Sequence, residues 1–198
     1  MRDFKNQGQL FPNESYYIEN LEHNIDIELS KEILIAWQKR IYDFQVNLFQ
    51  KKESIDKQKS LFNNNSIAQI DAINPLNLSP LALSFWRLQT CPQKGPALYF
   101  VMDQPKNLES PLLLYIGETI AAERRWKGEH DCKTYLSGYS EALSMASIRY
   151  QLSIRFWNDV PSETKHRRQI EQFLIKKWQP PFNKETRDRW KTPFTSDF

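Results

Sequence analysis

The chain reads Ala-Leu-Tyr-Phe-Val over residues 97–101 and Leu-Leu-Leu-Tyr-Ile over residues 112–116, and these two apolar runs decide its fold. Runs of this length and composition predict two β-strands. The polar, turn-rich segment 103–107 lies between them, so together they predict a β-hairpin with a long loop. Gly117 predicts the end of the second strand.

Two helices, a third strand and a last helix are predicted after the hairpin. They are expected over residues 119–127, 135–147, 148–157 and 162–178. Apolar residues at every second position from Ile148 to Phe156 predict the strand, and the pair Pro180-Pro181 predicts that the last helix stops before it. This order of elements is that of an α+β fold, with too few strands for a doubly wound sheet.

The first 90 residues are expected to form a mainly helical extension, and residues 91–198 a second domain. The clearest helical pattern covers residues 30–52, with Ser30 as the candidate N-cap. Its apolar stripe consists of Ile33, Trp37, Ile41, Phe44 and Leu48. The stripe predicts packing against this chain or against a partner.

The rest of the extension is less regular. Residues 1–28 predict a mostly irregular arm, and residues 53–66 predict a linker. Ser79 followed by Pro80 predicts the start of a short helix over residues 81–88.

Charge is unevenly distributed along the 198 residues, whose net charge is +3. Residues 1–95 are neutral, and residues 163–191 hold nine basic and four acidic side chains. A basic bias of this size does not by itself identify a nucleic-acid partner. Cys91 and Cys132 form no CxxC motif, which favours two reduced thiols in a cytoplasmic protein. No apolar run has transmembrane length and no signal peptide is visible, so no membrane association is expected.

The tyrosines of the two runs belong to a pattern that resembles the GIY-YIG nuclease family, over roughly residues 96–183. Tyr99 and the tripeptide Tyr-Ile-Gly at 115–117 match the two strand motifs that name the family, and Arg125 lies ten residues after Tyr115, where the family has its catalytic arginine. The first motif reads Ala-Leu-Tyr instead of Gly-Ile-Tyr, and the hairpin loop is longer than is common in the family. The resemblance implies a small three-stranded, mainly antiparallel sheet flanked by helices, and a metal-dependent phosphodiesterase.

Glu171 is a carboxylate on the apolar face of the last helix, with apolar residues three, four and seven positions later. Such a carboxylate needs a partner, because an unpaired buried charge is costly. The residues alone leave three interpretations open: a side chain that reaches solvent, an ion pair with Arg167, or a ligand of a metal or an arginine. The resemblance implies the metal ligand, since the family places its metal-binding glutamate on this helix, before a Pro and an Asn like Asn183.

The residues around Arg125 are candidates for contacts with phosphate. Arg124 points about 100° away from Arg125 on a helix, so its expected role is a solvated charge or a contact with the DNA backbone. Lys127 is assigned to the same nucleic-acid surface, and Gly117 is expected to let a phosphate approach the main chain. His130 is either a site residue or a surface histidine.

The resemblance implies a division of chemical roles. Glu171 would hold one Mg²⁺ or Mn²⁺, and Arg125 would bind the scissile phosphate. Tyr99 would take the proton from water, Tyr115 would orient water or phosphate, and Asn183 would fix the pocket by hydrogen bonding. A tyrosine acts as a base at neutral pH only if its pKa is lowered from about 10.

The stretch 184–191 has two interpretations. Arg187, Arg189 and Lys191 are predicted to follow a nucleic-acid backbone, and equally the tail is predicted to pack Trp190 on the core. The function expected from all these residues is a metal-dependent DNA endonuclease of restriction, repair or mobile-element type. The alternative is a non-catalytic nucleic-acid-binding or protein-interaction module with the same fold.

Overall fold

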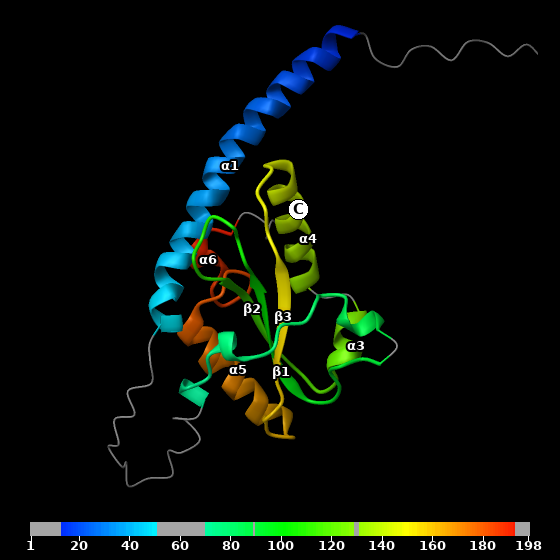
Figure 1. The fold of residues 1–198 in the computed structure, drawn as a ribbon, viewed down its shortest axis with the longest axis vertical. Helices are drawn as coiled ribbons and strands as arrows, with labels where there is room; N and C mark the ends of the chain where they lie inside the picture. The colour runs from blue at the N-terminus through cyan, green and yellow to red at the C-terminus, as the bar shows by residue number, and fades with distance from the viewer. Residues whose placement is uncertain (1–12, 51–69, 89, 129–130, 193–198) are drawn as a thin grey trace, which may run out of the picture.

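A computed structural model describes residues 13–50, 70–88, 90–128 and 131–192, with side chains from residue 31 onward. The fold is α+β, as expected, with one antiparallel three-stranded sheet flanked by helices (Figure 1). The strands are β1 (Ala97–Asp103), β2 (Leu112–Thr119) and β3 (Leu152–Trp157), in the spatial order β2-β1-β3. The outer edge of β2 is therefore one of the two edges of the sheet.

Every residue of β1 is buried, which shows that both faces of the sheet are covered. Tyr99 lies opposite Gly117 on β2 and Phe156 on β3, so these three share one face. The elements on that face are η2 (Phe85–Arg87), α3 (Ala122–Lys127) and α4 (Asp131–Met145). The alternate residues Leu98 and Phe100 face α5 (Thr164–Trp178) on the other side.

Helix α1 (Asn13–Gln50) is longer than the sequence predicted. The irregular arm expected over residues 1–28 is wrong from Asn13 onward, and Ser30 is not an N-cap, because no Gly or Pro interrupts the helix between Asn13 and Gln50. In the predicted stripe, Trp37 and Ile41 are buried, but Ile33 is 61% exposed. Leu34 takes its place in the core.

The buried part of α1 joins the core that contains Tyr99. Gln38 of α1 donates a hydrogen bond to the Tyr139 hydroxyl (2.7 Å), which donates to Asp103 of β1 (2.7 Å). This buried polar chain links α1, α4 and β1. The division of the protein into domains at residue 90 stays a prediction.

Several predicted boundaries differ from the structure, and the helices expected over residues 119–127 and 135–147 cover Ala122–Lys127 and Asp131–Met145. The short helix over residues 81–88 is wrong, because Leu81 exchanges two backbone hydrogen bonds with Ile154 on the outer edge of β3, and only Phe85–Arg87 is helical. The third strand begins at Leu152 instead of Ile148. Gly117 does not end the second strand, which continues to Thr119.

The outer edge of β2 is covered by side chains and not by another strand. The Gln45 amide of α1 donates to the Leu113 carbonyl (3.0 Å) and accepts from the Leu113 N–H (2.9 Å). Further along, the Phe182 N–H donates to the carbonyl of Leu114 (3.0 Å). Such contacts satisfy backbone groups that an edge strand otherwise leaves unpaired.

Two described segments remain, and they pack on opposite faces of the sheet: the segment of η1 on the α5 face, and α6 on the face that contains Tyr99. η1 (Pro75–Asn77) lies in a segment held by Arg155, whose Nη1 donates to the carbonyls of Pro75, Leu76 and Leu78. After α5 the chain turns at Gln179 and forms the short helix α6 (Arg187–Trp190). Among the described helices, none combines the length and the apolar character that a membrane span requires. The predicted linker over residues 53–66 lies outside the described residues.

Candidate active site

Two tyrosine rings lie over Gly117 on the face covered by α3 and α4. The β1–β2 register places Tyr99 opposite Gly117 and Tyr115 two residues earlier on the same strand. The rings stack, with centroids 5.9 Å apart and an angle of 28° between their planes. A Cβ on Gly117 would overlap the hydroxyl end of Tyr99 and lie 2.8 Å from Cε1 of Tyr115. Gly117 is needed for this ring packing, which is a different role from the turn that the sequence predicted.

Arg125 of α3 lies within hydrogen-bonding reach of both tyrosine hydroxyls. Burial raises the pKa of Tyr99 to about 12, although Arg125 opposes the shift. Burial and the neighbouring Tyr99 raise the pKa of Tyr115 still further. Both hydroxyls are therefore protonated at neutral pH, and the lowered pKa that a tyrosine base requires is not present in the described site.

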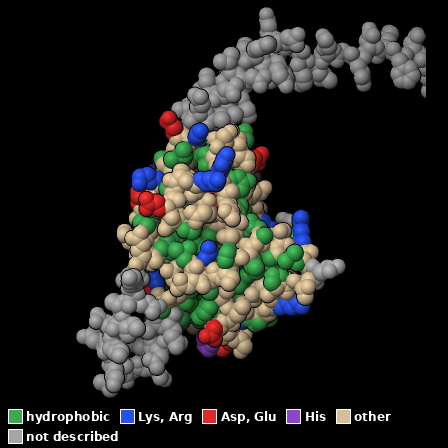
Figure 2. Space-filling view, in the orientation of Figure 1, with side chains coloured by type: hydrophobic (Ala, Val, Ile, Leu, Met, Phe, Trp, Pro, Cys, Tyr) green, Lys and Arg blue, Asp and Glu red, His purple; other side chains and the backbone are tan. Residues whose placement is uncertain are grey.

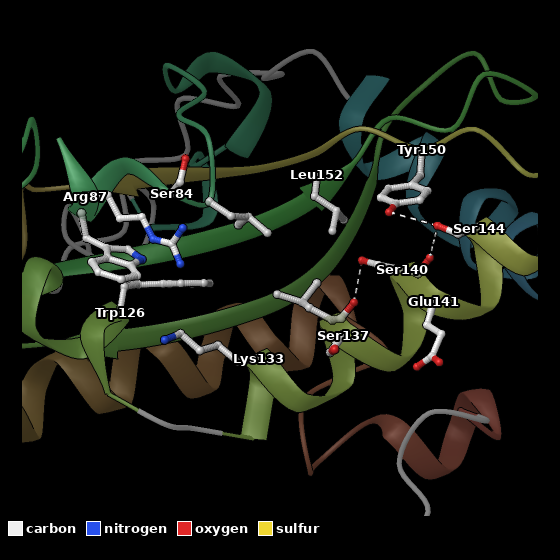
Figure 3. Close-up of a pocket in the computed structure, with 13 residues that line it drawn as sticks. Ser84, Arg87, Trp126, Lys133, Ser137, Ser140, Glu141, Ser144, Tyr150 and Leu152 are labelled. Carbon is white, nitrogen blue, oxygen red and sulfur yellow. Dashed lines mark hydrogen bonds between the residues drawn. The ribbon is translucent and has the colours of Figure 1, made fainter.

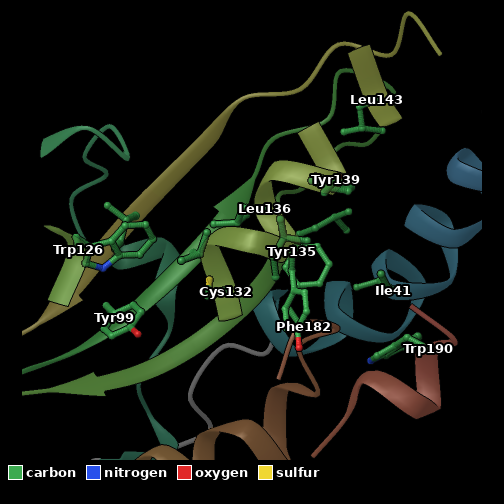
Figure 4. Close-up of a cluster of buried hydrophobic side chains, with 14 of the residues drawn as sticks. Ile41, Tyr99, Trp126, Cys132, Tyr135, Leu136, Tyr139, Leu143, Phe182 and Trp190 are labelled. Carbon is green, nitrogen blue, oxygen red and sulfur yellow. The ribbon is translucent and has the colours of Figure 1, made fainter. Parts of the chain in front are cut away.

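The side chains of the candidate site differ in their exposure to solvent. Tyr99 is 0% exposed, and its ring packs edge-on against Trp126, with centroids 5.8 Å apart (Figure 4). Tyr115 is half-buried and Arg125 is exposed. A substrate can therefore reach Arg125 and Tyr115 directly, whereas Tyr99 supports them from below.

Glu171 belongs to α5, on the other side of the sheet, but its side chain lies near Tyr115. α5 packs on the face opposite the tyrosines, but Glu171 lies at the open edge of β2, where its Oε1 accepts a hydrogen bond from the Glu118 N–H (2.9 Å). Its charge contributes to the raised pKa of Tyr115. Burial raises the pKa of Glu171 itself to about 7. Tyr99, Tyr115 and Arg125 thus lie together on one face of the sheet, and Glu171 approaches Tyr115 from the outer edge of β2.

Arg167 is not the partner of Glu171. Arg167 is fully buried, and its Nε lies 3.2 Å from Oε2 of Glu118, while Arg168 lies 3.4 Å from the other oxygen. The remaining donors of Arg167 contact the carbonyls of Pro161 and Ser162 and the hydroxyl of Thr164. The ion-pair interpretation of Glu171 is therefore wrong.

Glu118 was missed as a residue of this site. The signal for it is the alternation of β2, which turns Glu118 toward the apolar face on which α5 packs. A carboxylate there needs a cation, and Arg167 is the buried cation on the facing helix.

Asn183 clamps the main chain of β2. Its Oδ1 accepts from the Ile116 N–H (3.0 Å), and its Nδ2 donates to the Ile116 carbonyl (2.8 Å). The side chain is buried. Asn183 therefore positions the strand between Tyr115 and Gly117, in line with the predicted fixing role.

The predicted nucleic-acid contacts divide into two groups. Arg124 and Lys127 of α3 are exposed, and Lys and Arg side chains gather at the margin of the molecule around this helix (Figure 2). Arg187 donates to the Tyr135 hydroxyl (3.2 Å) beside the first turns of α4. Arg124 and Lys127 thus lie on the helix that carries Arg125.

The described part of the predicted tail, through Thr192, packs on the core. Trp190 is buried and donates to the Gln179 carbonyl (2.7 Å). Arg189 lies over the rings of Phe44 and Trp190, with its Cζ 4.5 and 5.2 Å from their centroids. Lys191 is exposed, and His130 lies outside the described residues.

The donor set at Glu171 fits one hard divalent cation with few protein ligands. Glu171 is half-buried, and no cationic side chain lies within 4.0 Å of it in the described part of the chain, although the charge of Arg168 partly opposes the rise of its pKa. No group of three or more His, Cys, Asp or Glu side chains that could hold a metal occurs in the described part of the chain. Mg²⁺ is commonly held by one or two carboxylates, with water and phosphate oxygens as the other ligands.

Comparison of the chain with protein-family models, with curated proteins and with solved structures finds no match.

Proposed function

We propose that this protein is a metal-dependent phosphodiesterase of the GIY-YIG type that cleaves DNA. The proposal is supported by the gathering of Tyr115, Arg125 and Glu171 around Gly117 at the end of β2. These residue types supply a cation for phosphate, a hydroxyl donor and a carboxylate for a metal. The positions of the three agree with the resemblance in sequence.

The observation that carries the proposal is that Glu171, a half-buried carboxylate with a raised pKa, forms no ion pair within 4.0 Å among the described residues. Its one described hydrogen bond comes from the Glu118 N–H, an interaction that the neutral oxygen of a glutamine also accepts. Elsewhere on the same edge, the amides of Gln45 and Asn183 perform this task without charge. A half-buried carboxylate with a raised pKa of about 7 costs more than an amide at this position, and a carboxylate is the stronger ligand for a divalent cation.

Each residue has a defined task in phosphodiester hydrolysis. Arg125 binds the phosphate and stabilises the charge that develops on its oxygens. Tyr115 donates a hydrogen bond to a phosphate oxygen or to the attacking water, and Tyr99 holds Arg125 and Tyr115 in place. A cation on Glu171 would supply Lewis-acid stabilisation of the phosphate and lower the pKa of a bound water. Tyr99 is not assigned as the base, because it is buried and its pKa is raised.

A non-catalytic module is the second candidate, and the complete burial of Tyr99 favours it. In that case Arg125 and the cations of α3 would bind nucleic acid without turnover. The two candidates differ in what they require of Glu171, because binding through basic side chains does not need a carboxylate. A cytoplasmic location belongs to the same proposal and stays a prediction.

The test is cleavage of plasmid DNA, branched DNA and RNA by wild type, Glu171→Gln and Glu185→Gln, with Mg²⁺, with Mn²⁺ and with a chelator. Glu185 is an exposed carboxylate near Glu171, so its substitution is the same chemical change outside the metal position. We expect metal-dependent cleavage of DNA by wild type and Glu185→Gln. Loss of a cation worth several kcal/mol lowers the rate of Glu171→Gln about 100-fold or more.

DNA affinity, measured in chelator, should be nearly equal for the three proteins. Cleavage by Glu171→Gln at the wild-type rate would contradict the proposal, and absence of cleavage by wild type on all substrates would favour the non-catalytic module.

A further inference from the structure

A groove of about 730 Å³ lies between η2, α4 and β3, away from Tyr115 and Glu171 (Figure 3). Its walls include Trp86 and Arg87 of η2, Trp126 of α3 and Lys133 of α4. η2 precedes the part of the chain that resembles the nuclease family, so this groove is built from elements on both sides of that boundary. Its volume is in the range of small-molecule sites, roughly 300–1,000 Å³.

One end of the groove is aromatic and cationic. The Arg87 guanidinium carbon lies 4.9 Å from the centroid of the Trp86 ring, and the Lys133 ammonium lies 5.7 Å from it. The two cations come from different elements and meet at one half-exposed indole. Glu141 is the acidic residue of the lining, and its carboxylate points away from the hydroxyl groups of the groove (Figure 3). The aromatic end is therefore suited to an anion with a flat ring.

The other end is lined by hydroxyl groups of α4. Ser140 donates its proton to the Leu136 carbonyl (2.7 Å), and Ser144 donates to the Ser140 carbonyl (2.7 Å). Because their protons are used within the helix, these oxygens offer acceptor positions to the groove. Tyr150 lies beside Ser144, with its hydroxyl 3.4 Å away. This end can accept hydrogen bonds from the N–H groups of a base or the hydroxyl of a sugar.

α3 connects the groove to the candidate active site. Trp126 lines the groove and packs edge-on against Tyr99, and its neighbour Arg125 belongs to the active site. The Lys133 ammonium donates to the Gly128 carbonyl at the end of α3 (2.8 Å). Arg124 and Lys127 are exposed on the same short helix. Cations thus continue from the active site over α3 to Lys133 and Arg87.

We propose that this groove binds one or two unpaired nucleotides of a single-stranded nucleic acid. A base packs against Trp86 while Arg87 and Lys133 contact its phosphates, which is the combination by which proteins hold single strands. A pocket of this volume does not admit a duplex. That the groove guides a strand toward the scissile phosphate rests on the proposed nuclease function. That the groove binds a single strand does not.

The test measures the affinity for fluorescein-labelled oligo(dT) of 12 nucleotides by anisotropy, in chelator, so that no cleavage occurs. The Arg87→Ala/Lys133→Ala variant is compared with wild type and with Lys165→Ala/Lys176→Ala, which removes two exposed cations of α5. We expect the groove variant to bind at least about 10-fold more weakly, with a salt slope smaller by about 1.4, since each phosphate contact contributes about 0.7 for single strands. The α5 variant should bind like wild type. Melting temperatures confirm that all the proteins are folded.

Tryptophan fluorescence supplies a second readout. Oligo(dT) should quench the emission of wild type, and Trp86→Phe should remove most of that quenching while preserving the packing of the ring. Oligo(U) of the same length shows whether the site discriminates between DNA and RNA, and a blunt duplex should be bound equally by wild type and the groove variant.

Equal weakening in the groove and α5 variants, an unchanged affinity in the groove variant, or no binding of oligo(dT) by wild type would overturn the proposal. The result of the cleavage test is independent of the result of this binding test. If wild type cleaves nothing with metal but its binding depends on Arg87 and Lys133, the groove stands and the proposed activity fails.

Discussion

Two parts of the outer edge of β2 differ in the side chains that pair with their free backbone groups. At Leu113 and Ile116, the neutral amides of Gln45 and Asn183 each pair with both the N–H and the carbonyl of one residue. At Glu118, the carboxylate of Glu171 accepts from the N–H alone. A carboxylate has no proton to donate when it is ionised, so it covers the edge less completely than an amide does.

The difference distinguishes the amides, which stabilise the strand, from the carboxylate, to which the proposed function assigns a metal. The amide clamps stabilise the strand and hold Tyr115 and Gly117 in register. Glu171 instead places a half-buried carboxylate at the Glu118 N–H, close enough to Tyr115 to raise the pKa of that tyrosine. Substitutions of Asn183, Gly117 and Glu171 therefore test the two parts of the edge separately.

The largest effect is expected at an amide clamp. Asn183→Leu leaves the N–H and the carbonyl of Ile116 buried without partners, so we expect a loss of about 2–5 kcal/mol in the free energy of unfolding. Urea denaturation measures the change, and Asn107→Leu, at an exposed loop position, is the control. A loss below 0.5 kcal/mol for Asn183→Leu would show that water replaces the clamp.

Gly117→Ala tests the packing of the tyrosine rings over Gly117, which lies between Ile116 and Glu118 on β2. The added Cβ overlaps Tyr99 and approaches Tyr115, so we expect a loss of about 1–3 kcal/mol and displaced tyrosines. Gly128→Ala is the matched control, because the nearest atom to its Cβ is the Arg125 carbonyl oxygen at 4.0 Å. Equal stability of the two variants would contradict the packing role of Gly117.

The sequence predicted the second half of the fold well because its strands are strongly apolar and its helices have clear ends. The apolar run 97–101 begins where β1 begins and lies within it, and the expected stop before Pro180 agrees with the end of α5 at Trp178. The segment around Leu81 was not predictable in the same way. Its extended form follows from hydrogen bonds to Ile154, which lies 73 positions away, and local pattern does not contain that information.

The candidate site was predictable as a set of residues but not as a set of contacts. Tyr115, Arg125 and Glu171 follow from the motif, whereas the Glu118–Arg167 pair and the Gln45 clamp depend on how α5 and α1 pack against β2. The raised pKa of Tyr99 likewise follows from its burial and not from its position in the motif.

The charged end of the edge should show a pH-dependent stability. The folded-state pKa of Glu171, about 7, lies above its usual value of 4.5, so the native state holds a proton that the unfolded state has released between these pH values. Stability due to this group therefore falls as pH rises from 4.5 to 7. Glu171→Gln should match wild type near pH 4 and exceed it at pH 8, by on the order of 1–2 kcal/mol after allowance for solvent screening. Thermal melts across this range measure the difference, and a constant difference at all pH values would contradict the shifted pKa.

The most direct test of the central claim, that the charge of Glu171 exists for a divalent cation, is a Mg²⁺ titration of wild type and Glu171→Gln at pH 8 without nucleic acid, followed by thermal shift and calorimetry. Wild type should be stabilised by roughly 1 kcal/mol when Mg²⁺ is a few-fold above its dissociation constant. The stabilisation should weaken below pH 7, because the carboxylate must lose its proton to bind. Glu171→Gln should show no such shift, and Glu185→Gln should behave like wild type. Equal Mg²⁺ stabilisation of wild type and Glu171→Gln would contradict the account.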